Sequence, residues 1–98
     1  MRRAAKIDAN QPAIVDALRA CGAVVQSLAA VGNGCPDLLV AYRGHTIIVE
    51  IKDGSKPPSA RELTPDQLKW HAAWKGGRLA LVTDVEGALR ILKVIDAS

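Results

Sequence analysis

Two runs rich in β-forming residues, 37–42 and 46–52, flank the short polar turn Arg43-Gly44. A polar, glycine-containing pair between two such runs is typical of a β-hairpin. If these two residues form the turn, counting back along the ladder places Asp37 directly opposite Glu50. A turn one residue longer or shorter would move Asp37 to the other face. The register of this hairpin therefore decides which side chains meet.

The predicted register brings like charges together. Asp37 and Glu50 would share a face with their Cβ atoms about 5 Å apart, which is destabilising unless something lies between them. A divalent cation with oxygen ligands would remove the repulsion. Strand alternation places Lys52 on the same side as Glu50. Two alternatives stay open: Glu50 and Lys52 as an ordinary exposed pair, and Asp37 as a turn residue that follows Pro36.

The remaining patterns predict an α/β domain in the order α-β-β-β-α-β-α, with a mixed central sheet. The expected elements outside the hairpin are a helix over 11–21, a strand over 23–28, a helix from Thr64 to 74, a strand over 78–82 and a helix from Thr83 to 93. Capping-box patterns open the last two helices, at Thr64–Gln67 and Thr83–Glu86. Residues 53–62 contain two prolines, two serines and a glycine and predict a mobile loop.

Length and composition limit the classes of protein to which the chain can belong. Its 98 residues correspond to one domain over 1–98, with an aliphatic core because there is no Phe. A net charge of +3 suits a polyanionic partner without proving one. No run approaches the roughly 20 apolar residues of a membrane span, and two cysteines make neither a disulfide framework nor a zinc set. We expect a cytoplasmic protein with two free thiols and no membrane association.

Three motifs in order resemble a known family. They are G-x-P-D-L-L-V at 34–40, V-E-I-K at 49–52 and L-T-x-x-Q-x-x-W at 63–70. Together they resemble the VRR-NUC (virus-type replication-repair nuclease) domain of the PD-(D/E)XK, restriction-endonuclease-like superfamily, over roughly residues 7–93. The resemblance implies a restriction-endonuclease-like fold and a single nuclease domain.

The resemblance also implies roles for particular residues. Asp37 and Glu50 would hold Mg²⁺ or Mn²⁺ with help from the carbonyl of Ile51. Lys52 would orient or polarise the attacking water and balance charge on the phosphate. Gln67 would support the site from the second helix, although a capping partner of Thr64 explains it equally well.

Other candidates carry a functional and an ordinary interpretation. In this family an acidic residue of the first helix often completes the metal site, and the aligned residue here is Asp8. Its side chain is shorter than that of the usual Glu, and it lies at or before the start of the helix. The alternative is that Asp8 caps the helix. The basic residues Arg3, Lys6, Lys56 and Arg61 would contact DNA phosphates or be solvated surface charges. Trp70 and Trp74 are expected to fill the core. His45 and His71 are expected to be surface residues.

The expected function is that of a metal-dependent endodeoxyribonuclease. As the resemblance implies, it would act as a homodimer on branched DNA such as Holliday junctions, in phage-type repair or recombination. Two active sites related by two-fold symmetry suit paired nicks. The alternatives are a non-catalytic module that binds DNA or protein on the same fold, and a structural domain of a larger assembly.

Overall fold

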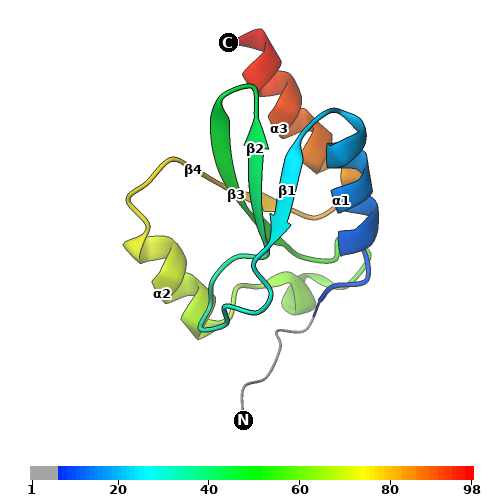
Figure 1. The fold of residues 1–98 in the computed structure, drawn as a ribbon. Coiled ribbons are helices and arrows are strands. Elements are labelled where there is room, and N and C mark those ends of the chain that lie inside the picture. Colours follow the sequence, from blue (N-terminus) through cyan, green and yellow to red (C-terminus); the bar gives the residue numbers. More distant parts are fainter. Residues whose placement is uncertain (1–6) are drawn as a thin grey trace.

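The structure, a computed structural model, describes residues 7–98 as one mixed sheet with helices packed around it (Figure 1). The elements are α1 (Gln11–Ala20), β1 (Val24–Ser27), β2 (Leu38–Tyr42), β3 (His45–Ile51), the 3₁₀ helix η1 (Pro58–Arg61), α2 (Pro65–Ala73), β4 (Arg78–Val82) and α3 (Val85–Ala97). The predicted order and the mixed sheet are confirmed, with η1 added. Among residues 7–98, no helix is long and apolar enough to cross a membrane.

The hairpin β2–β3 lies in the middle of the sheet, whose strand order is β1-β2-β3-β4. β1, β2 and β3 pair antiparallel, and β4 runs parallel to β3. Tyr42 pairs with His45 and Leu38 with Val49, so the predicted register is confirmed. Arg43 and Gly44 have φ angles of 48° and 79°, as a two-residue hairpin turn of the right twist requires.

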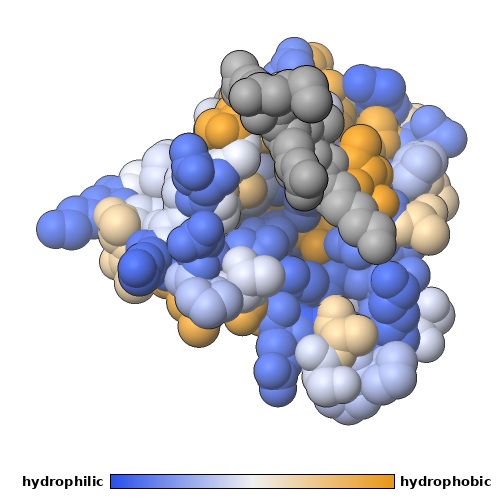
Figure 2. Space-filling view, turned by 90° about the horizontal axis from the view of Figure 1, so that it is seen from below, coloured by the Kyte–Doolittle hydropathy of each residue, from blue (hydrophilic) through white to orange (hydrophobic). Residues whose placement is uncertain are grey.

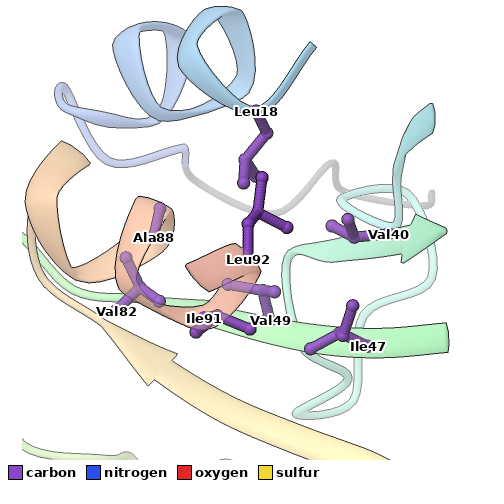
Figure 3. Close-up of a pocket in the computed structure, with 8 residues that line it drawn as sticks. All are labelled: Leu18, Val40, Ile47, Val49, Val82, Ala88, Ile91 and Leu92. Atoms are coloured by element: carbon purple, nitrogen blue, oxygen red, sulfur yellow. The ribbon is translucent and has the colours of Figure 1, made fainter. Parts of the chain in front are cut away.

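The core lies between one face of the sheet and the two helices α1 and α3, which contact each other (Figure 1). Alternate residues of β2 are buried, as expected for a strand with one face in the core. Figure 3 shows a small cavity in this core. Its lining is entirely aliphatic: Leu18, Val40, Ile47, Val49, Val82, Ala88, Ile91 and Leu92. With no polar group to orient a ligand, it is a gap in packing and no ligand site.

Helix α2 stands apart from this core. None of its residues is buried, so the prediction that its tryptophans fill the core is wrong. Trp70 and Trp74 stack on each other instead, with ring centroids 5.1 Å apart and planes 15° from parallel. The Trp74 Nε1–H donates to the carbonyl of Gly77 at 2.9 Å. By stacking, each ring covers apolar surface of the other that is not buried in the core.

The loop before β2 holds the first turn of α2 close to the sheet. Gly34 has a φ of +81°, and a Cβ built there would collide with the backbone carbonyl of Asp66. Only glycine permits both the left-handed backbone and this close approach. The Gly-x-Pro-Asp segment thus positions α2 next to Asp37.

Two local predictions need correction. The capping box at Thr83–Glu86 does not form, because α3 begins one residue later: Asp84 is the N-cap and accepts the backbone N–H of Gly87 at 2.7 Å. α3 also continues four residues beyond the predicted end, to Ala97.

Residues 53–62 contain η1, and Asp53 accepts the N–H and hydroxyl of Ser55 at 3.0 and 2.7 Å. The segment thus has local structure, and its mobility stays a prediction.

Candidate metal centre

Asp37 and Glu50 lie together where β3 ends and β2 begins. Leu38 pairs with Val49, so Asp37 and Glu50 are the next residues along the ladder. The Asp37 carboxylate Oδ2 accepts the backbone N–H of Ile51 at 2.6 Å. Glu50 is only 1% exposed although it points away from the apolar core. The hairpin thus carries a buried carboxyl beside a second carboxylate.

The surroundings of Glu50 change its ionisation. Burial raises the pKa of Glu50 to about 8, and the hydrogen bond and negative charge of Asp37 add to the effect. The positive charge of Lys52 lowers the pKa of Glu50, and the charge of Asp8 raises it further. A metal-free site therefore holds a proton where a cation with two carboxylate ligands could replace it.

Gln67 of α2 connects the acidic pair to Lys52. Its Oε1 accepts from the Lys52 Nζ at 2.7 Å and from the Thr64 backbone N–H at 2.9 Å. Its Nε2 donates to Glu50 Oε2 at 3.4 Å. Gln67 therefore completes the capping box of α2 and also contacts Lys52 and Glu50, and its support of a metal site stays a prediction.

Lys52 is 9% exposed, so its ammonium is held mainly by protein groups. A buried ammonium is costly without hydrogen-bond partners and nearby negative charge. The Gln67 amide oxygen supplies the first, and Glu50 supplies the second when it is ionised. The result is a positive charge held in a fixed position near Glu50.

His71 is a site residue that the sequence analysis missed. Its Nε2 lies 3.0 Å from Glu50 Oε1. Burial, followed by the charge of Lys52, lowers the pKa of His71, so the ring is neutral at pH 7 and donates when its proton is on Nε2. His71 follows Gln67 by one helical turn on the same face of α2, and this spacing could have indicated it once Gln67 was placed at the site.

The remaining candidates are less closely placed. Asp8 acts on Glu50 through its charge, but within residues 7–98 no three His, Cys, Asp or Glu side chains gather as a metal-binding group. Lys56 is exposed, and Arg61 is partly buried. Arg3 and Lys6 lie outside the described residues. The roles of all five stay predictions.

The donor set fits a hard divalent cation. Mg²⁺ commonly takes one or two protein carboxylates and completes its shell with water and substrate phosphate, so two carboxylates are enough. Asp37 and Glu50 would provide them. The Ile51 N–H donates to Asp37, and the role of the Ile51 carbonyl stays a prediction. A soft metal is not favoured, because the nearest thiol, Cys35, has its pKa raised by burial and by the charges of Glu50 and Asp37.

Comparison with solved structures found one of the same architecture. The chain is similar to a protein described as a VRR_NUC domain, with a TM-score of 0.63 and 28% sequence identity, over 85% of this chain and 89% of the other. The likeness extends over most of both chains. No family model and no curated protein matches the chain.

Glu50→Gln tests whether burial and the neighbouring Asp37 hold Glu50 protonated in the metal-free protein. Below about pH 4.5 the Glu50 carboxyl is protonated in folded and unfolded chains and adds no cost. Above that pH the Glu50 carboxyl ionises in the unfolded chain but keeps its proton in the folded chain. The free energy of unfolding therefore falls as the pH rises to about 8, by roughly 1–3 kcal/mol. Urea unfolding between pH 4.5 and 8.5 should show this loss in the wild type and a smaller loss in Glu50→Gln.

Manganese provides the matching control for that experiment. At pH 8 the wild type should gain stability from Mn²⁺ because the cation replaces the missing proton, and Glu50→Gln should gain less. Parallel stability profiles for the two proteins, with and without Mn²⁺, would show that the pKa of Glu50 is not raised in the folded protein.

Proposed function

We propose that this chain, a domain of the VRR-NUC type with a restriction-endonuclease-like fold, is a DNA endonuclease that uses Mg²⁺ or Mn²⁺ to hydrolyse phosphodiester bonds. The observation that carries the proposal is the buried Glu50 carboxyl beside the carboxylate of Asp37, with Lys52 linked to Glu50 through Gln67. A non-catalytic domain has no need to bury one carboxyl group next to another.

Each group has a task in this reaction. Asp37 and Glu50 would hold the cation, and the cation would neutralise the scissile phosphate and lower the pKa of a bound water. The ammonium of Lys52 would face charge that develops on the phosphoryl oxygens, in a position fixed by Gln67. His71 would hold Glu50 in its rotamer by donating to Oε1. No covalent nucleophile is required, because direct attack by water suffices.

The face that carries α2, η1 and the ends of the strands suits a polyanion. Figure 2 shows this face from below, with hydrophilic residues across its middle. Lys56 and Arg61 belong to the segment that leaves the β3 end next to Lys52. Contacts from these residues to phosphates would position DNA without reading its sequence. We propose branched DNA, including Holliday junctions, as the substrate.

The cleavage activity of the Lys52→Ala variant tests the catalytic role proposed for Lys52. Wild-type protein with Mg²⁺ or Mn²⁺ should cut a labelled four-way junction, and Lys52→Ala should cut about 10²-fold or more slowly because the charge at the transition state is lost. Lys52→Ala should still bind Mn²⁺, whereas Asp37→Ala should lose both binding and cleavage.

Arg90→Ala provides the control, since it removes an exposed positive charge on α3 outside this network. A linear duplex of the same sequence tests the preference for branched DNA. If wild-type protein binds the junction but never cuts it with either metal, the non-catalytic binding module is the correct interpretation.

The outer face of the sheet supports assembly as a homodimer. Val24, Leu39 and Leu81 are exposed, and the strand register places them on the same face as Glu50. α1 and α3 cover only the opposite face (Figure 1). A second copy on this outer face would bury the apolar side chains and bring two metal sites to one side of a junction.

Leu81→Asp tests the dimer. Light scattering should give the wild type twice the 10.4 kDa of one chain, and Leu81→Asp should give a single chain because a charge replaces a side chain that is 54% exposed in the monomer. Val94→Asp, on α3 and equally exposed, is the control and should stay dimeric. A wild type that is monomeric at the assay concentration would rule the dimer out.

A further inference from the structure

The stacked tryptophan pair of α2 leaves aromatic surface at the exterior of the protein. Trp70 is half-buried and Trp74 is 36% exposed, and neither belongs to the apolar core. Tryptophan is on average among the more buried residues of folded proteins. Two neighbouring tryptophans outside the core therefore indicate a surface that another molecule can cover.

Three contacts hold the Trp74 ring in a fixed position. The ring stacks on Trp70, with centroids 5.1 Å apart, and its Nε1–H donates to the carbonyl of Gly77 at 2.9 Å. The main chain also passes so close to the ring at Gly76 that a Cβ built there would collide with it. An exposed side chain that is already fixed loses little conformational entropy when a ligand binds to it.

The pair lies beside the face of α2 that contacts the acidic site. Trp70 and Trp74 follow Gln67 and His71 by three positions each, so the two pairs occupy neighbouring faces of the helix. The rings of Trp70 and His71 meet edge to face with centroids 6.3 Å apart, and His71 Nε2 lies 3.0 Å from Glu50 Oε1. A DNA strand with a phosphate at Glu50 would therefore reach the tryptophans within a few nucleotides.

The surroundings of the tryptophan pair are basic. The chain has no acidic residue between Asp66 and Asp84, and Lys69, Lys75 and Arg78 in this stretch are exposed. None of these three cations forms an ion pair with another residue among 7–98. Like charges oppose the pairing of this surface with itself in a second copy. Single-stranded nucleic acid fits it, because cations can follow the phosphates while bases stack on the rings.

We propose that Trp70 and Trp74 form a stacking platform for an unpaired nucleobase of the DNA strand that enters the metal site. The inference rests on the proposed function, since it takes DNA as the ligand and places the cleaved phosphate at Glu50. Every base has a π-face, so the stacking platform accepts any base without reading sequence. Bases inside a duplex stack on one another and are not available to it. The stacking platform therefore selects DNA that has unpaired nucleotides close to the cut.

Intrinsic fluorescence reports on the stacking platform directly, because Trp70 and Trp74 are the two tryptophans of the chain. An oligothymidylate added to the wild type without metal should quench the fluorescence as its bases stack on the rings. An abasic strand of the same length carries the same phosphates and no bases. It should bind about 10-fold more weakly, by the anisotropy of a fluorescent label, and leave the tryptophan emission nearly unchanged.

Variants of α2 separate stacking from ordinary apolar contact. Trp74→Leu keeps an apolar side chain and removes the π-face, so it should bind the oligothymidylate about 10-fold more weakly and the abasic strand as the wild type does. Trp74→Phe restores an aromatic face and should recover most of the affinity. Leu68→Ala is the matched control, because Leu68 is 55% exposed on another side of the same helix, and it should leave both affinities within about 2-fold.

A purely structural pair would give a different result. If the tryptophans only fasten the end of α2, the two strands bind the wild type equally and neither quenches its fluorescence, and this result overturns the proposal. Binding of neither strand overturns it as well. Should Trp74→Leu not fold, the comparison of the two strands on the wild type decides, because it needs no variant.

Two outcomes separate this inference from the proposed function. A wild type that shows base-dependent quenching but cuts no DNA with Mg²⁺ or Mn²⁺ contradicts the proposed endonuclease and supports the stacking platform. A wild type that cuts DNA without base-dependent quenching overturns only this inference.

Discussion

The contact between Asp37 and Glu50 is the constraint on which the site depends. The hairpin register brings the two carboxyl groups together, and Glu50, which is 1% exposed, has little water to stabilise its charge. The pKa of Glu50 near 8 expresses this conflict. Proteins keep such a cost where function repays it, and a divalent cation is the simplest partner that satisfies both carboxylates.

α2 contributes polar contacts to this site and almost nothing to the core. The side chains of Gln67 and His71 reach the acidic pair from one face of the helix, while the stacked tryptophans cover another part of its surface. The close approach at Gly34 sets the distance between α2 and the strands. The position of the Lys52 ammonium therefore depends on a helix whose own packing is slight, and the proposed activity should be linked to the stability of α2.

Local chemistry made part of this site predictable. The Arg43-Gly44 turn fixes the register, and alternation then places Glu50 and Lys52 on one face; both expectations are confirmed. The contacts from His71 and the exposure of the tryptophans could not be predicted, because they depend on where α2 lies in three dimensions. The shift of the α3 cap to Asp84 follows from a choice between adjacent capping residues, which sequence patterns resolve poorly.

A crystal structure of the wild-type protein grown with Mn²⁺ tests the central claim most directly, because anomalous scattering locates the metal independently of any assumption about ligands. The account predicts one strong anomalous peak within about 2.3 Å of a carboxylate oxygen of Asp37 and of Glu50, with the Lys52 ammonium beside it but not bound to it. A peak elsewhere, or no peak while Asp37 and Glu50 remain hydrogen-bonded to each other, would contradict it.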